Sequence, residues 1–230
     1  MLHPAHVLPY GETSVGAGLS GQLALRPITS SAKAVSPNVG SFQDLGVAPG
    51  VAPWVSGRMG IANSNEAGLI YDGRSIRIDA RHAFSFGKLT LSTELGVSGI
   101  VAHPIGSGRD ASGVYGAGAD LPVLLGLKST SDIYSLWFGP RAGFEILGGR
   151  LQFGDGTAPS LYDVSARHVY GGLVAGLRVG FRHVHAVIEL DANYHWVDGS
   201  FKTSGSTGGG SSTNVQQISL TPAGALEISF

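Results

Sequence analysis

The sequence contains no cysteine. This absence excludes a disulfide framework, thiol chemistry and any cysteine-bound metal site. Charged residues are also scarce, at 13% of the chain, which is about half of the usual ~25%. The formal net charge is -1, so the chain lacks the basic footprint that nucleic-acid binding requires.

Long apolar runs are missing as well. The densest run, LPVLLGL at 121–127, is far shorter than the roughly 20 residues that a transmembrane helix needs. Residues 1–14 lack a basic region followed by an apolar one, so we expect that a signal peptide has been removed. Glycine, by contrast, is abundant: the chain has 36, roughly twice the average share of ~7%.

Strict alternation of apolar and polar residues recurs along the chain. In SIRIDARHAF (75–84), Arg77, Asp79 and Arg81 fall on one face, and the isoleucines and an alanine fall on the other. A period of two predicts a β-strand. Ten such segments are predicted, at residues 13–26, 50–62, 66–71, 74–84, 88–102, 113–128, 132–147, 166–181, 184–197 and 214–230.

The predicted connections alternate in length, as do the short periplasmic turns and longer outer loops of membrane barrels. One outer connection is short, at Asp72-Gly73, and Asp-Gly is a strong hairpin signal. Accepting this hairpin gives ten strands, and rejecting it favours eight. The short connections are 63–65, 85–87, 129–131 and 182–183, and the long ones are 27–49, 103–112, 148–165 and 198–213.

The two faces of the strands predict where water and lipid lie. The apolar faces stay free of charge for about ten residues, the length of a tilted membrane strand. The only lysines in the predicted strands, Lys88 and Lys128, lie at strand ends. We therefore predict an all-β fold, a transmembrane antiparallel up-and-down barrel over residues 13–230, with charges toward the lumen. A soluble barrel or sandwich, with apolar faces inward, is the alternative.

Residues 1–12 are predicted to form an N-terminal periplasmic segment, which either stays a tail or folds into the barrel mouth. Hairpin geometry predicts four cross-strand pairs in the lumen: Gly68 with Arg77, Asp79 with Glu94, Asp120 with Arg141, and Gly176 with Glu189. The predicted lumen charge network is Arg58, Glu66, Arg77, Asp79, Arg81, Glu94, Asp120, Arg141, Glu145, Arg178, Glu189, Asp191 and Glu227.

This network has two interpretations. Buried charges need partners, so it could be structural filling of a small barrel. Alternatively, inward glycines such as Gly96 and Gly176 could leave room for a narrow path for ions or solutes. Two aromatic belts are predicted where lipid headgroups meet the strands. The belt residues are Phe84, Phe86, Tyr134, Phe181 and Phe230 at the periplasmic side, and Tyr71, Tyr115, Tyr194 and Trp196 at the outer side.

The chain ends in GALEISF, where Leu226, Ile228 and the terminal Phe230 alternate with polar residues. This last strand resembles the insertion signal of bacterial outer-membrane β-barrel proteins. The resemblance is to a class and not to a functional family. It implies a location in the Gram-negative outer membrane, the lipid bilayer as partner, and recognition of the Phe230 strand by the barrel-insertion machinery.

Catalytic and metal-binding patterns are weak. Asp191 and His195 share the lumen face, with Ser200 nearby, and some barrels are rim hydrolases. Positions four apart on a strand lie about 13 Å apart, so these residues alone cannot form a site, and we expect no enzyme. His183 and His185 lack a third metal ligand, and we expect them to meet water and headgroups at a periplasmic turn. No metal or cofactor is predicted.

The predicted function is therefore that of an integral outer-membrane barrel, acting as a narrow pore for passive transport or as a structural membrane protein. The alternative is a binding or adhesion module, in which the loops at 27–49, 148–165 and 198–213 contact a protein partner.

Overall fold

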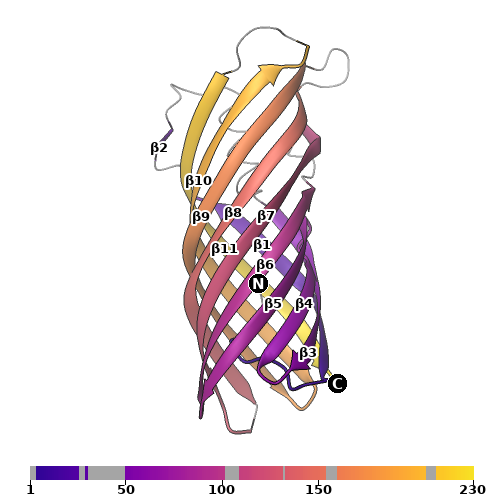
Figure 1. Ribbon diagram of the computed structural model, residues 1–230, viewed down its shortest axis with the longest axis vertical. Helices are drawn as coiled ribbons and strands as arrows, with labels where there is room; N and C mark the ends of the chain where they lie inside the picture. Colours follow the sequence, from indigo (N-terminus) through magenta and orange to yellow (C-terminus); the bar gives the residue numbers. More distant parts are fainter. Residues whose placement is uncertain are drawn as a thin grey trace.

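The computed structural model describes residues 4–25, 29–30, 50–101, 109–131, 133–153, 160–205 and 211–230. Ten long antiparallel strands and one two-residue strand form a single sheet (Figure 1). The strands are β1 (Thr13–Ala24), β2 (Thr29–Ser30), β3 (Gly50–Ala62), β4 (Asn65–Tyr71), β5 (Ser75–Phe86), β6 (Leu89–Val101), β7 (Arg109–Lys128), β8 (Tyr134–Phe153), β9 (Ser160–Phe181), β10 (Val184–Thr203) and β11 (Ser211–Ser229).

The sheet closes on itself, because β1 pairs with both β3 and β11. Thr13 and Phe230 exchange two backbone hydrogen bonds of 3.1 and 2.9 Å at the seam. The short β2 pairs only with β11 and adds no strand to the ring. The ten-stranded up-and-down barrel predicted from the sequence is thereby confirmed. No helix in the described residues is long and apolar enough to cross a membrane.

The strands on one side of the barrel are longer than predicted. β8 continues to Phe153, β9 already begins at Ser160, and β10 continues to Thr203. Much of the two predicted loops 148–165 and 198–213 is therefore strand, which corrects the sequence-based prediction. Of the other long connections, the described residues include only 29–30 within 27–49 and 109–112 within 103–112, and all of these are strand.

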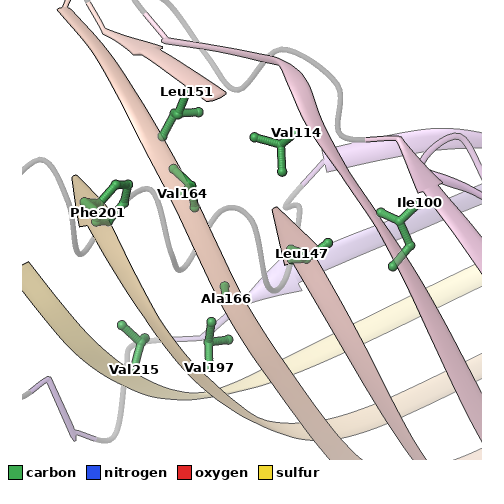
Figure 2. Close-up of a cluster of buried hydrophobic side chains, with 9 residues drawn as sticks. All are labelled: Ile100, Val114, Leu147, Leu151, Val164, Ala166, Val197, Phe201 and Val215. Carbon is green, nitrogen blue, oxygen red and sulfur yellow. The ribbon is translucent and has the colours of Figure 1, made fainter. Parts of the chain in front are cut away.

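The alternation of polar and apolar residues reverses along these long strands. On β10, Tyr194 and Trp196 face outward with 42% and 50% exposure, whereas the next outward residue is the exposed Asp198. From here to the outer strand ends, the apolar side chains point inward. Figure 2 shows the cluster that they form: Ile100, Val114, Leu147, Leu151, Val164, Ala166, Val197, Phe201 and Val215.

Most outward residues beyond this level are polar or charged, among them Arg150, Asp163, Arg167, Asp198 and Lys202, with Leu161 as an apolar exception. A surface of this kind suits water, and an apolar surface suits lipid. The reversal therefore marks the outer boundary of the membrane. Beyond that boundary, the barrel continues with an apolar core of the kind found in soluble β-proteins.

The predicted cross-strand register was right in one hairpin and wrong by two residues in three. Gly176 lies opposite Glu189 as predicted. In the β4–β5 turn, the Asp72 carboxylate accepts hydrogen bonds from the backbone N–H groups of Arg74 and Ser75 at 3.0 and 2.6 Å, which makes the turn wider than two residues. The corrected pairs are Gly68 with Asp79, Arg81 with Glu94, and Pro122 with Arg141. A slip of two keeps every side chain on its face.

The position of the membrane boundary can be tested on one strand. Leu190→Arg would place a charge on the lipid face, and we expect it to lower the free energy of unfolding by about 2–4 kcal/mol. Ser200→Arg lies on the same outward face of β10 but beyond the boundary, and we expect a change within about 0.5 kcal/mol. Urea unfolding in lipid vesicles measures both. Equal costs for the two variants would mean that the boundary is misplaced.

Candidate functional site in the barrel lumen

All thirteen residues of the predicted lumen charge network lie on the inward face of the barrel. Ten of them are at most 8% exposed, and Arg141, Glu145 and Glu227 are half-buried. Side chains that line a water-filled channel would remain accessible to water. The low exposure therefore shows that the lumen is filled with side chains at these levels.

The centre of the lumen holds a continuous ion-pair network. Arg77 contacts three carboxylates, with Nη1 2.6 Å from Asp79 Oδ2, Nη2 2.5 Å from Glu94 Oε1, and Nε 2.7 Å from Asp120 Oδ1. Arg58 contacts Glu66 through Nε, and its Nη2 lies 2.6 Å from Asp79 Oδ1. Several of these contacts join strands that are not neighbours in the sheet, such as β5 and β7. These contacts therefore bridge over one intervening strand inside the lumen.

Two more arginines extend the network toward both ends. Arg81 Nη2 lies 2.8 Å from Glu66 Oε1 on the periplasmic side. Arg141 Nε lies 3.2 Å from Asp120 Oδ2, and its Nη1 lies 3.3 Å from Asp191 Oδ2 on the outer side. Because each buried charge has an opposite charge within reach, the arrangement avoids the large cost of an isolated ion in a low dielectric.

The N-terminal segment folds into the periplasmic mouth. Arg81 donates hydrogen bonds to the backbone carbonyls of Pro4 and His6, and the backbone N–H of Leu8 donates to Glu66 Oε2 at 2.8 Å. Ala5 is fully buried and packs against the wall at Gly126 of β7. The segment covers a cavity of about 170 Å³ whose lining includes charged groups from several strands: Arg58, Glu66, Arg81, Arg178 and Glu227.

The sequence predicts a polar lumen, whereas part of the lumen in the structure is apolar. A second apolar cluster lies inside the membrane-spanning part. Trp137 is 2% exposed, and its indole N–H donates to Glu189 Oε2 at 2.9 Å. A Cβ at Gly176 would lie 2.1 Å from this indole ring. The cluster comprises Ala5, Trp54, Ile70, Leu124, Trp137, Val174 and Val187.

The inward glycines therefore do not leave an open path. Gly176 makes room for Trp137, and a Cβ at Gly96 would lie 2.3 Å from the Arg77 guanidinium. Space that the sequence offered to a solute is taken up by large side chains. This finding corrects the prediction that these glycines widen the lumen.

The three residues considered for a rim hydrolase are not brought together. Asp191 pairs with Arg141, and Ser200 is exposed on the outward face, opposite to that of His195. Instead, His195 Nε2 lies 2.7 Å from Ser219 Oγ, a partner that the sequence analysis missed. The alternation places Ser219 inward, but no local pattern distinguishes it from other inward serines. The Ser219 side chain is fully buried.

Two further predictions concern the barrel surface and ends. His185 does not meet water at the turn, because it is 1% exposed and lies 3.2 Å from Arg178 Nη2, whereas His183 is exposed as expected. The nine residues of the predicted aromatic belts all lie on the outward surface. They are Tyr71, Phe84, Phe86, Tyr115, Tyr134, Phe181, Tyr194, Trp196 and Phe230.

A closed barrel with an apolar exterior, aromatic residues on its outward surface and a charged interior defines a transmembrane β-barrel of the Gram-negative outer membrane. The lipid bilayer is its partner. The turns β3–β4, β5–β6, β7–β8 and β9–β10 lie at the same end of the barrel as the paired residues Thr13 and Phe230, and we assign this end to the periplasm. The extended strands lie at the other, outer end.

No protein-family model matches the chain, and no curated protein matches it. In structure, it is similar to Neisserial surface protein A, with 15% identity, a TM-score of 0.33, and coverage of 96% of this chain and 99% of that one. It is also similar to Ail, the attachment invasion locus protein of Yersinia pestis, with 11% identity, a TM-score of 0.35, and 96% and 100% coverage. A third similar structure is a major outer membrane protein from Thermus thermophilus, with 11% identity, a TM-score of 0.42, and 96% and 100% coverage. None of these similarities identifies a function.

The energetic weight of the central network can be measured with a matched pair of variants. Arg77→Ala would leave buried carboxylates without their shared cation, and we expect it to lower the free energy of unfolding by about 3–5 kcal/mol. Arg150→Ala removes an ion pair of 3.5 Å with Asp163, which lies in water, and should cost less than about 1 kcal/mol. Urea titration of both refolded variants provides the comparison. A small loss in Arg77→Ala would contradict a tightly coupled network.

Proposed function

We propose that this protein is a closed, non-conducting outer-membrane barrel that presents its outer strand extensions at the cell surface. The observation that carries the proposal is the filling of the lumen at successive levels. The N-terminal segment occupies the periplasmic mouth, the arginine–carboxylate network and the inner apolar cluster fill the centre, and the outer apolar cluster fills the far end. A narrow pore would need all of these levels to open together.

The outer extensions support a role in presentation. β8, β9 and β10 run 20 to 22 residues, whereas about ten are enough to cross the membrane. The additional residues form a rigid wall with its own apolar core and an outward face that carries charges of both signs, such as Arg167 and Asp198. A protein partner would meet this wall and the connections that it supports.

The remaining parts of the proposal concern assembly and chemistry. Phe230 is 65% exposed at the end of the closing strand β11, where the barrel-insertion machinery could bind it. Asp191 is occupied by Arg141, and Ser219 is fully buried, which supports a non-enzymatic role. The barrel then serves as a membrane anchor for the outer wall.

Single-channel recording in a planar bilayer tests whether the lumen is closed. We expect the refolded protein to show no steady openings at about pH 7.5, because its inward charges are paired and buried. Heat-modifiable migration on a gel serves as the control that the silent protein is folded. Steady openings whose amplitude changes in Arg141→Ala and Glu94→Ala would overturn the proposal and show that these charges line a conducting path.

A further inference from the structure

A chain of hydrogen bonds crosses the lumen just below the outer apolar cluster. Arg74 Nη2 lies 3.0 Å from Glu145 Oε2, which lies 2.8 Å from His168 Nδ1. His168 Nε2 lies 2.8 Å from His195 Nδ1, and His195 Nε2 lies 2.7 Å from Ser219 Oγ. We call these five residues the outer crossbar.

The outer crossbar joins distant parts of the wall. Arg74 lies in the β4–β5 turn, and Glu145, His168, His195 and Ser219 belong to β8, β9, β10 and β11. Because β5 and β8 are separated by two strands in the sheet, the bond between Arg74 and Glu145 spans the lumen. The two histidines and the serine are at most 3% exposed, so water does not compete for their hydrogen bonds.

Proton counting limits the states that this chain can adopt. A carboxylate only accepts hydrogen bonds, so His168 Nδ1 must donate to Glu145. With both rings neutral, His195 Nδ1 donates to His168 Nε2, and the Ser219 hydroxyl donates to His195 Nε2. One added proton can also be accommodated. His168 Nε2 then donates to His195 Nδ1, and His195 Nε2 donates to the Ser219 hydroxyl, so each ring nitrogen keeps a partner. A second added proton would set two N–H groups against each other at 2.8 Å, and the bond would be lost.

The outer crossbar lies next to apolar residues of the outer apolar cluster, which follow it toward the outer end of the barrel. On β8, β9 and β10, the next inward residue toward the outer end is apolar: Leu147, Ala166 and Val197. These residues belong to the cluster in Figure 2, and each is at most 2% exposed. Loss of the bond between the rings would push the two side chains apart inside the barrel, while the backbone ladder of β9 and β10 stays paired, and would loosen this cluster from below.

We propose that the outer crossbar is a pH-sensitive latch on the outer end of the lumen. Near neutral pH it holds the outer apolar cluster closed, and in acid the doubly protonated histidine pair releases it. This inference rests on the proposed function, since a latch has meaning only for a closed lumen. Histidine suits the role because it is the side chain that changes its charge closest to neutral pH.

The charged and titratable groups around the pair come from several elements. Glu145 is the carboxylate that faces His168 from β8, at 2.8 Å. Arg74 from the β4–β5 turn and Arg141 from β8 are cations that oppose the second. Tyr170 on β9 stacks near both rings, at 5.3 and 5.9 Å between ring centroids. Asp191 on β10 is held by Arg141 at 3.3 Å. The second proton is therefore the step that requires acid.

Cysteine labelling can follow the latch directly, because the chain has no native cysteine. Val215→Cys places a thiol in the outer apolar cluster, and Ser200→Cys places one on the exposed outward face. The ratio of their rates with a methanethiosulfonate reagent corrects for the effect of pH on the thiol itself. We expect this ratio to rise about tenfold or more between about pH 7.5 and about pH 3, because burial and the neighbouring cations delay the second protonation.

Glutamine variants identify the responsible residues. In the Val215→Cys background, His195→Gln should abolish the rise in acid, and His168→Gln serves the same purpose if the first variant does not fold. His185→Gln removes another buried lumen histidine, near the periplasmic end, and should leave the rise intact. Gel mobility at each pH confirms that the barrel stays folded.

Two outcomes would overturn the latch. One is a labelling ratio that stays constant down to about pH 3 in the folded protein. The other is a rise that persists in His195→Gln and His168→Gln. Neither outcome would affect the closed barrel, which fails only if the protein conducts near neutral pH in the planar bilayer.

Discussion

The structure depends on one constraint: in lipid, every backbone N–H and C=O must be paired within the protein. A sheet meets this requirement only when it has no free edge, and the pairing of β1 with β11 removes that edge. In the closed barrel, successive residues of a strand face opposite sides, so one alternate set faces lipid and the other faces the lumen. The charged residues at alternate positions must then point inward, because the other face of each strand meets lipid. The ion-pair network is thus a consequence of closure in lipid.

The same rule explains why the pattern reverses on the outer side. Where a strand leaves the membrane, water replaces lipid outside it, and the favourable outward residue changes from apolar to charged. On β10, this happens between Trp196 and Asp198. The inward positions must then become apolar, because they are the only place where a core can form. One continuous strand therefore carries two opposite patterns. In lipid the barrel interior holds the charge network beside one apolar cluster, and in water it is apolar.

The sequence predicts the features that depend on parity and misses those that depend on three-dimensional fit. The barrel, its strand number and the inward face of Arg77 or Glu94 follow from alternation alone. The register of three hairpins does not, because a side chain such as Asp72 widens a turn without changing the face of any residue. The loops predicted at 148–165 and 198–213 are shorter in the structure. The outer extensions are strands with apolar residues inward, the reverse of the pattern that indicates membrane strands.

The filling of the lumen could not be predicted from the sequence, for a related reason. A glycine at an inward position leaves space, but the sequence does not say what occupies it. In the structure, Trp137 lies over Gly176, and Arg77 lies over Gly96. Both partners come from the neighbouring strand, at positions fixed by the cross-strand register: Trp137 lies directly opposite Gly176, and Gly96 lies opposite Asp79, two residues from Arg77. The bond between His168 and His195 has the same origin, since its two rings lie on adjacent strands but not at directly paired positions.

The lumen is filled at several levels, and these levels differ in the interactions that keep the barrel closed. The central network is held by charges that stay paired over a wide range of conditions, because its cations are all arginines. The outer apolar cluster is held by burial, which does not depend on protonation. Only the outer crossbar between these two levels contains histidines bonded to each other, among the residues that the structure describes. It is therefore the level at which protonation in acid can alter the bonding. A barrel closed in this way can change at its outer end and still keep its centre intact.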